Sequence, residues 1–411
     1  MKKPAAIHAP LKQFPTKDNE LVIGGKTVTE LAEDVGCTPF YAYDSAAMSR
    51  RVAELRAVLP EGVSLHYAMK ANPMPEVVRH LATLVDGIDV ASAGELEVAL
   101  TTETPPHEIS FAGPGKRDWE LLAAIKAGIT VNLESPNEMR RLATIGEAEG
   151  IKPRVAVRVN PDFELKASGM KMGGGPKAFG IDAEQVPDVL REIGERDLDF
   201  VGFHIFSGSQ NLRPESIIET QEKTFELAYR LAEDAPQPVT LLNIGGGFGI
   251  PYFPGEARLD LEPVSAELAK RLSECRARLP EAEVVIELGR YFVGEAGVYI
   301  SRVIDRKLSR GEVFLITDGG LHHHLAASGN FGQVVRRNYP VVVANRVESE
   351  DKEMVSVCGP LCTPLDVLAN KMTLSHAEEG DLIAVLQSGA YGYTASPLGF
   401  LSHPKPVEIF L

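Results

Sequence analysis

Lys70 is the residue whose type and position point most directly to chemistry. It follows the apolar, β-prone run Val63–Met69, and Asn72 and Pro73 end that run immediately afterwards. A lysine at the end of an apolar strand is placed to lose its hydrating water, and desolvation lowers the pKa of an amine. A neutral amine can form a Schiff base, so Lys70 is a candidate nucleophile. The alternative is an ordinary lysine whose ammonium group reaches solvent at the end of a strand.

Further polar residues fall at the ends of other β-like runs. They are Asp89, Ser92, Arg158, Asn160, His204 and Glu287. Taken singly, each has an ordinary explanation, and for His204 it is a histidine whose nitrogens are satisfied in the core. Their concentration at one end of successive runs instead predicts a shared site.

Glycines mark a candidate anion site. Gly245, Gly246 and Gly247 come directly after a β-like run, and glycine lets backbone N–H groups approach an anion closely. Ser207 and Arg290 could add a hydroxyl and a guanidinium to the same phosphate. A glycine run also makes plain tight turns, so on its own it is a weak signal.

Short β-like runs alternate with amphipathic helical runs between about Ala46 and Arg290. The β-like runs are Val63–Met69, Gly87–Ser92, Glu108–Ala112, Thr130–Glu134, Arg154–Asn160, Phe200–Phe206, Thr240–Ile244 and Glu283–Leu288. The helical runs include Pro75–Leu84, Lys116–Ala127, Pro136–Glu149, Ala183–Ile193 and Pro214–Ala235. This alternation predicts a parallel sheet, and eight units favour a closed (β/α)₈ TIM-type barrel over an open doubly wound sheet.

The sequence pattern changes after Arg290, where strand-like runs separated by turns replace the alternation of strands and helices. The expected strands are Val298–Arg306, Val313–Thr317, Val341–Val347, Met354–Val357, Leu382–Leu386 and Pro406–Phe410. We therefore predict a barrel over residues 46–290 and a β-rich C-terminal domain, a β-sandwich or β-barrel, over residues 291–411. Residues 1–45 are expected to join the C-terminal domain. A second glycine-rich segment, Gly169–Gly180, is expected to be a mobile loop or a flexible linker.

Composition narrows the class of protein. The 411 residues carry a formal charge of −15, which argues against nucleic acid and anionic membranes as main partners. Apolar residues make up 44%, without a run long enough to span a bilayer. Four cysteines are too few for a disulfide framework in a chain of this length, so we expect a cytoplasmic protein.

The order of Lys70, His204, the triple glycine and a Glu-x-Gly-Arg motif ending at Arg290 resembles the fold-type III pyridoxal-phosphate decarboxylases. This family includes ornithine and diaminopimelate decarboxylases, and the resemblance covers nearly the whole chain. It implies an alanine-racemase-like barrel with a β-domain, a homodimer with shared active sites, and pyridoxal 5'-phosphate as cofactor. No metal is expected.

The resemblance also implies roles for individual residues. Lys70 would carry the cofactor covalently, His204 would stack on its ring, and Glu287 would pair with the pyridine nitrogen. A carboxylate beside that nitrogen keeps it protonated, and a pyridinium is a strong electron sink. The remaining cofactor contacts implied are Asp89, Arg158, Ser207, Gly245, Gly246, Gly247, Gly289, Arg290 and Tyr391.

The motif from Cys358 to Asp366 is a further mark of the family. The resemblance implies that Cys362 enters the partner subunit's site and protonates the substrate carbanion, a task that suits the pKa of a thiol. The alternatives are a buried inert cysteine and a redox pair with Cys358. The Cys-x₃-Cys spacing is poor for zinc.

Departures from the family concern the substrate. Ornithine and diaminopimelate decarboxylases place an acid at Thr363, and the latter also carry an arginine and a tyrosine where Ala326 and Asn330 stand here. The distal pocket is therefore expected to be neutral, with His323 in its lining. The substrate contacts expected are Arg290, His323, Thr363, Asp366 and Tyr391.

The expected activity is removal of the α-carboxylate from an amino acid or from a side-chain-tethered aminoacyl substrate. The Cys-Thr-Pro-Leu-Asp sequence at Cys362–Asp366 and the segment His204–Gln210 resemble a subgroup of exosortase-associated and carrier-protein glutamyl decarboxylases. Members of this subgroup occur in exopolysaccharide pathways. An acyl-carrier protein is thus an expected partner, with Arg336 and Arg337 as a candidate basic patch. The alternatives are a decarboxylase of free diaminopimelate, ornithine or lysine, an amino-acid racemase, and a non-catalytic regulator-binding homologue.

Overall fold

The computed structural model describes residues 7–10, 12–163, 170–171 and 173–411. Parts of the glycine-rich segment, Gly169 and Met172, lie outside the described residues. The chain forms two compact units, which we call the barrel unit and the sheet unit. The barrel unit comprises Arg51–Ile250 and Leu259–Gly289, and the sheet unit the described residues of Met1–Arg50, Pro251–Arg258 and Arg290–Leu411. The boundaries expected at residues 45 and 290 stay a prediction.

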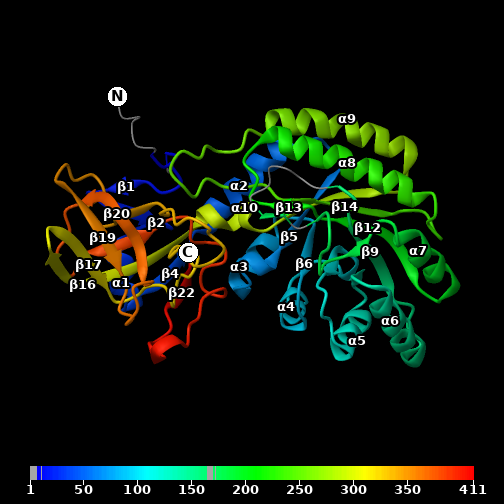
Figure 1. Cartoon of the computed structure of the whole chain (residues 1–411), viewed down its shortest axis with the longest axis horizontal. Helices are drawn as coiled ribbons and strands as arrows, with labels where there is room; N and C mark the ends of the chain where they lie inside the picture. The colour runs from blue at the N-terminus through cyan, green and yellow to red at the C-terminus, as the bar shows by residue number, and fades with distance from the viewer. Residues whose placement is uncertain (1–6, 11, 164–169, 172) are drawn as a thin grey trace. The chain divides into compact units, whose positions relative to one another are not determined.

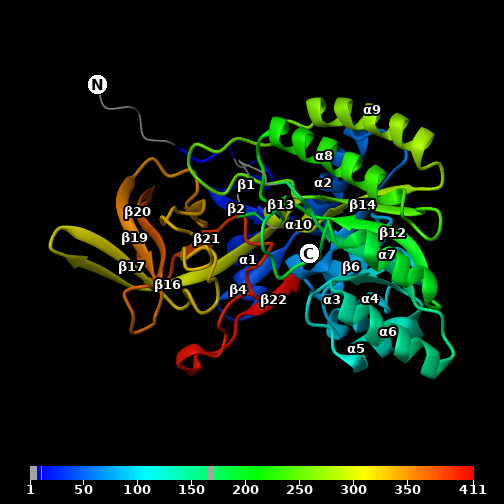
Figure 2. The ribbon, with the colours of Figure 1, turned by 45° about the vertical axis from the view of Figure 1, so that its right-hand side comes forward.

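Eight parallel strands close into a barrel in the barrel unit (Figures 1 and 2). They are β5 Val63–Ala68, β6 Gly87–Val90, β7 Ile109–Phe111, β8 Thr130–Leu133, β9 Arg154–Asn160, β12 Asp199–Ile205, β14 Leu241–Gly246 and β15 Glu283–Leu288. Strand β15 pairs with β5, and β8 pairs with β9, so no edge is left open. The predicted (β/α)₈ barrel is therefore confirmed, and the open doubly wound sheet is excluded.

Helices cover the outside of the barrel between successive strands (Figure 1). They are α3 Pro75–Ala82, α4 Ala93–Ala99, α5 Asp118–Ala127, α6 Pro136–Glu149, α7 Val186–Glu195, α8 Pro214–Ala232 and α9 Glu262–Arg278, with α2 Ser45–Val58 preceding β5. Helix α6 shows how the sequence sets these bounds. Ser135 caps its first turn by accepting the N–H of Glu138 at 3.1 Å, and Gly150 ends it in the left-handed conformation.

Helices α2, α4 and α9 are not among the helical runs named from the sequence. Helix α9 is charged on most of its surface, yet it buries Val264, Leu268, Leu272 and Cys275. These residues are spaced by four and three positions, which is the helical period, so the signal was present but weak. Short pairings accompany the barrel: β11 Ile181–Asp182 beside β9, and β10 Met170–Lys171 with β13 Gly208–Ser209.

The sheet unit is built on an eight-stranded sheet around the long strand β16. Its strands are β4 Phe40–Tyr43, β16 Gly297–Ser309, β17 Glu312–Thr317, β18 Val341–Val343, β19 Lys352–Cys358, β20 Val367–Ser375, β21 Leu382–Val385 and β22 Val407–Phe410. A three-stranded sheet (β1 Thr16–Lys17, β2 Glu20–Ile23, β3 Lys26–Thr27), helix α1 Val28–Val35 and the short α10 Arg290–Val293 complete it. The predicted second, mostly β domain is confirmed.

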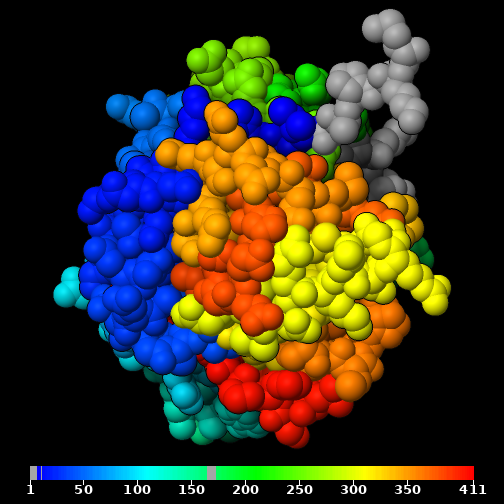
Figure 3. Space-filling model, turned by 90° about the vertical axis from the view of Figure 1, so that its left-hand side faces the viewer, coloured from blue at the N-terminus to red at the C-terminus, as the bar shows by residue number. Residues whose placement is uncertain are grey.

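Segments from opposite ends of the chain lie side by side in the sheet unit. Strand β4 pairs antiparallel with β16 and parallel with β22, and Figure 3 shows the N-terminal residues, in blue, beside orange and red C-terminal ones. Their apolar side chains share one core, which includes Ile23, Phe40, Ile300 and Ala384. Among the described residues, no helix is both long enough and apolar enough to cross a membrane.

Three consecutive histidines, His322, His323 and His324, are buried in the sheet unit. His323 Nδ1 lies 3.0 Å from the hydroxyl of Tyr299, and its Nε2 lies 2.8 Å from the carbonyl oxygen of Pro404. Both nitrogens are thus engaged within this unit. Its ring belongs to the core of the unit, which does not favour the predicted place of His323 in the lining of a substrate pocket, and that role stays a prediction.

A substitution at Gly202 tests the packing of the barrel strands. Gly202 lies in β12 at a φ of 151°, and a Cβ there would overlap the carbonyl oxygen of Leu241 in β14. We expect Gly202→Ala to destabilise the protein by about 2–4 kcal/mol in urea unfolding. Gly94→Ala in α4 is the matched control, since a Cβ there meets only Ser92 Oγ, at 3.9 Å, and alanine favours a helix. Equal stability of the two variants would contradict this account.

The buried histidines predict a pH dependence of stability. Burial lowers the pKa of His322 and of His324 to about 3 and that of His323 to about 4. The unfolded chain therefore binds more protons than the folded chain below about pH 6.5. The stabilising contribution is complete above that pH and is lost as the pH falls toward about 4, so the urea midpoint should fall between about pH 7 and about pH 5.

Replacing one histidine tests this source of acid sensitivity. Neither nitrogen of His322 has a hydrogen-bond partner among the described residues, so His322→Leu removes a titrating group without breaking a bond. We expect a shallower pH slope in His322→Leu and an unchanged slope in His107→Leu, which alters an exposed histidine. A slope that is the same in all three proteins would rule out the buried ring as its cause.

Candidate active site

The carboxyl ends of the barrel strands surround a cavity of about 330 Å³, which we call the strand-end cavity. Five of the residues that line it carry ionisable side chains: Lys70, Asp89, Arg158, His204 and Glu287. They come from the ends of β5, β6, β9, β12 and β15. The structure thus brings together residues up to 217 positions apart in the sequence.

Lys70 lies in the 3₁₀ turn Met69–Ala71 that follows β5 directly. Its Nζ is 3.3 Å from Oε1 of Glu287 and 5.7 Å from the centre of the Phe206 ring. The side chain is 45% exposed. The prediction that Lys70 is desolvated is therefore wrong, because nearly half of its side chain is exposed.

Glu287 is a buried carboxylate at the end of β15. Oε1 faces Lys70, and Oε2 lies 3.0 Å from Nε2 of His204. Burial acts to raise the pKa of Glu287, but the positive charges of Lys70 and Arg158 and the interaction with His204 outweigh it, so the pKa lies below its usual range. The cavity therefore contains a permanent anion, which suits a protonated ring nitrogen.

His204 is buried at the end of β12. Its Nδ1 has no partner, and its Nε2 makes no well-formed hydrogen bond among the described residues despite the short distance to Glu287. A histidine that is satisfied in the core would have both nitrogens paired. This ring is instead available at the wall of the cavity.

Asp89 and Arg158 line another side of the cavity. Oδ1 of Asp89 accepts a hydrogen bond from Ser110 Oγ at 2.5 Å and lies 3.3 Å from His66 Nδ1, while Oδ2 has no partner among the described residues. Arg158 donates from Nη1 to Glu134 at 2.7 Å, and its guanidinium lies 5.1 Å from the ring centre of Phe179.

The glycine run forms the end of β14 and a close backbone turn. Gly245 and Gly247 have φ values of 68° and 71°, and a Cβ on Gly246 would overlap the carbonyl oxygen of Glu287. Ser207 lines the same small hollow, and its buried Oγ has no partner among the described residues. A free hydroxyl beside a glycine turn is suited to an anion such as a phosphate.

Gly289 has a packing role that differs from that of the glycine run. A Cβ there would lie 2.7 Å from the carbonyl oxygen of Ala68 and 2.8 Å from Cβ of Ala71. Glycine is therefore required for the end of β15 to approach the turn that carries Lys70. Its predicted contact with a cofactor stays a prediction.

Arg290 and Tyr391 lie together in the sheet unit. The Arg290 guanidinium is 4.8 Å from the ring centre of Tyr391, and Nη1 donates to the hydroxyl of Tyr252 at 3.1 Å. Nε of Arg290 has no partner among the described residues. An incompletely paired guanidinium beside a tyrosine could bind an anion, which is the predicted role of the pair.

The segment from Cys358 to Asp366 is a tight loop in the sheet unit. Both oxygens of Asp366 accept backbone N–H groups, from Leu321 at 2.6 Å and from Leu361 at 2.8 Å. Asp366 thus shapes the loop and is engaged within it, which does not favour its predicted contact with substrate. Cys362 is exposed, so the alternative of a buried cysteine does not hold, and both cysteines are free. Thr363 is half-buried beside Cys362.

Arg336 and Arg337 do not form the expected free basic patch. The Arg336 guanidinium donates to the carbonyl oxygen of Val367. Arg337 pairs with Glu256 at 3.2 Å and stacks 3.8 Å from the ring centre of Phe253. Both charges are therefore engaged within the sheet unit.

Sequence reasoning missed several residues around the cavity, among them Phe206, Phe179 and Glu134. Phe206 and Phe179 line it, and Glu134 holds Arg158. Phe206 and Glu134 directly follow the strands β12 and β8, so their positions at strand ends were readable. Phe179 follows no barrel strand, and only the folded path of its segment places it there.

Comparisons with known proteins agree with this geometry. Residues 45–294 match the family described as pyridoxal-dependent decarboxylase, pyridoxal binding domain. Over 378 residues, the chain is 38% identical to the L-glutamyl-(BtrI acyl-carrier protein) decarboxylase of Niallia circulans, which covers 90% of this chain and 88% of that protein. It is 32% identical to the diaminopimelate decarboxylase of Aquifex aeolicus, covering 96% of this chain and 91% of that protein.

A solved structure shares the fold along almost the whole chain. The diaminopimelate decarboxylase of M. jannaschii, in co-complex with L-lysine, superposes with a TM-score of 0.87 at 25% identity. The superposition covers 98% of this chain and 93% of that one. The family match and the identity to these relatives agree with a barrel that carries Lys70 at a strand end. This chain therefore belongs to the pyridoxal-dependent decarboxylases, which are carboxy-lyases that use pyridoxal 5'-phosphate.

Proposed function

We propose that this decarboxylase acts on a glutamyl or similar aminoacyl unit attached through its side chain to a carrier protein. The observation that carries the proposal is the 38% identity, over 90% of the chain, to a decarboxylase of a carrier-bound glutamyl unit. Residues of the sheet unit support it, because Thr363, Ala326 and Asn330 offer no charge to a distal amine or carboxylate. Ala326 is buried, and the Asn330 amide donates to Ser328 Oγ at 2.8 Å.

The strand-end cavity has the groups that pyridoxal 5'-phosphate requires. Lys70 supplies a primary amine for the aldehyde, and Glu287 supplies a buried carboxylate for the ring nitrogen. The partnerless hydroxyl of Ser207 and the turn Gly245–Gly247 suit the phosphate. A cavity of about 330 Å³ is within the range of small-molecule sites.

Each residue then has a defined task in the reaction. When bound, the cofactor supplies an electron sink for the electron pair left as the α-carboxylate departs as CO₂. Glu287 would keep a proton on the ring nitrogen, because an adjacent anion favours the protonated form. His204 would hold the ring from the wall of the cavity. One proton must return to Cα, and we assign its delivery to the thiol of Cys362 from a second subunit.

A homodimer is part of the proposal. Cys362 is exposed in the sheet unit, and so are the apolar side chains of Phe331, Val334, Val335 and Leu365. Apolar groups of this kind are commonly covered by a partner. We also infer a reducing compartment such as the cytoplasm, because all four cysteines are free.

The competing activities are less well supported. A racemase on this fold would be expected, from the resemblance, to place an arginine against the ring nitrogen, whereas Glu287 offers an anion. A non-catalytic homologue would not need the amine, the carboxylate and the glycine turn together. Free diaminopimelate remains the second candidate substrate, because several relatives are diaminopimelate decarboxylases.

Removing the amine of Lys70 tests the cofactor site. We expect the purified protein to absorb visible light, and Lys70→Ala to lose that band and to lower turnover by about 10³-fold or more. Lys126→Ala, which alters a lysine paired with Glu149 on the outside of the barrel, should keep both. A folded wild-type protein that stays colourless when supplied with the cofactor would refute the assignment.

A substrate comparison tests the tether. We expect kcat/KM for a glutamyl unit on a carrier protein to exceed that for free glutamate, lysine, ornithine and diaminopimelate by about 10²-fold, because remote contacts contribute to the transition state. Loss of CO₂ can be followed by mass spectrometry. Equal or faster turnover of a free amino acid would contradict a tethered substrate, and preference for diaminopimelate would support the second candidate.

A further inference from the structure

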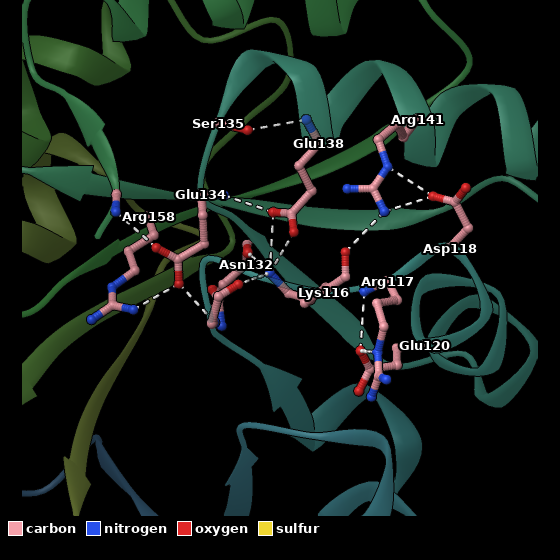
Figure 4. Close-up of polar contacts among 12 residues, drawn as sticks. Lys116, Arg117, Asp118, Glu120, Asn132, Glu134, Ser135, Glu138, Arg141 and Arg158 are labelled. Carbon is pink, nitrogen blue, oxygen red and sulfur yellow. Dashed lines mark hydrogen bonds and ion pairs between the residues drawn. The ribbon is translucent and has the colours of Figure 1, made fainter. Parts of the chain in front are cut away.

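Glu134 connects three segments beside the strand-end cavity (Figure 4). It follows β8 directly and is buried. Oε1 accepts hydrogen bonds from Arg158 Nη1 and from the N–H of Gly113, each at 2.7 Å. Oε2 accepts the N–H of Gly180, also at 2.7 Å. Short hydrogen bonds to a carboxylate are among the strong ones, so all three donors are firmly placed.

The three segments held by Glu134 form one wall of the cavity. Gly113, Arg158 and Phe179 line it, and Glu134 itself lies behind them. Gly180 packs closely on β9, where a Cβ would lie 2.8 Å from the backbone nitrogen of Asn160. The position of Phe179 is therefore fixed by the hydrogen bond and the close packing of the next residue.

Charge reinforces this arrangement. Burial acts to raise the pKa of Glu134. Arg158, the N–H of Gly180 and Lys116 together outweigh this effect, so the pKa lies below its usual range. Arg158 is itself buried. A buried guanidinium left without an anion would be strongly destabilising, which makes Glu134 its required partner.

A second ion pair supports Glu134 from outside. Lys116 Nζ lies 3.0 and 3.1 Å from the two oxygens of Glu138, and it also donates to the carbonyl oxygen of Gly113 at 2.8 Å. Glu138 accepts the N–H of Glu134 at 2.8 Å. Gly113 is thus held at both its N–H and its carbonyl. Figure 4 shows the contacts of Lys116 with Glu138 and of Glu134 with Arg158.

We propose that Glu134 is a positioning residue for the cofactor, which sets the pose of Arg158 and of the backbone at Gly113 and Gly180 before the cofactor binds. Glu134 acts through these groups and does not itself contact the ligand. The inference rests on the assignment of the strand-end cavity as the cofactor site.

Cofactor binding to Glu134→Gln tests the inference. The enzyme is freed of cofactor and titrated with pyridoxal 5'-phosphate, and the Kd is read from absorbance while thermal unfolding of the cofactor-free form is recorded separately. The amide cannot accept all three hydrogen bonds, so we expect the Kd to rise about tenfold. Glu192→Gln is the matched control, because Glu192 also accepts from arginines, Arg140 and Arg196, but on the outside of the barrel.

A double-mutant cycle separates positioning from general stability. If Glu134 acts through Arg158, Glu134→Gln should raise the Kd by less than about threefold when Arg158 is already glutamine. Additive losses, or an unchanged Kd in Glu134→Gln, would overturn the inference. A purely structural residue would lower the unfolding temperature without this coupling.

Two further outcomes are separable. If Glu134→Gln does not fold, Glu134→Asp takes its place. Aspartate keeps the negative charge, but its side chain is one methylene shorter, so the carboxylate lies farther from the three donors. A raised Kd in Glu134→Asp then supports the inference and an unchanged one overturns it. Wild-type enzyme that binds no cofactor would refute the cofactor site, whereas normal binding with an unaffected variant would refute only the role of Glu134.

Discussion

A buried, ionised carboxylate is the constraint on which the strand-end cavity depends. Removing a carboxylate from water costs several kcal/mol unless opposite charges compensate it. For Glu287, compensation comes from the charges of Lys70 and Arg158 and from its interaction with His204. Together with Glu287, these residues belong to four different strand ends, and a closed parallel barrel brings all four ends to one face. The fold and the electrostatics of the site therefore require each other.

Charges alternate outward from this centre. Arg158 helps to compensate Glu287 on one side and is itself paired with Glu134 on the other. Beyond Glu134 lies the buried pair of Lys116 and Glu138. The result is a layered set of buried ions in which each has a neighbour of opposite sign. Such a set holds side chains in defined poses, which is what catalysis by orientation needs.

The sequence predicted the barrel and the cluster at its strand ends well, because strand period, turns and chain order are local signals. Lys70, Asp89, Arg158, His204 and Glu287 do meet in one cavity. Properties that depend on distant partners were not predictable. The exposure of Lys70 depends on the cavity that several strand ends form around it. The burial of His323 depends on Tyr299 and Pro404, which contact its ring nitrogens. Strand β20 was missed because Asn370 and Lys371, the latter with a φ of 49°, interrupt its apolar pattern.

The pairing of β4 with β16 and β22 has a consequence for how the protein is made. Strand β4 is synthesised before the whole barrel, yet its partners follow it by some 250 to 370 residues, as the hydrogen bond from Tyr43 to Glu408 illustrates. Phe40, Tyr41, Ala42 and Tyr43 are all buried in the finished sheet. During synthesis this apolar strand has no partner until the chain beyond the barrel has emerged. An unpaired apolar strand favours aggregation, so the incomplete chain carries a hazard that the finished sheet does not.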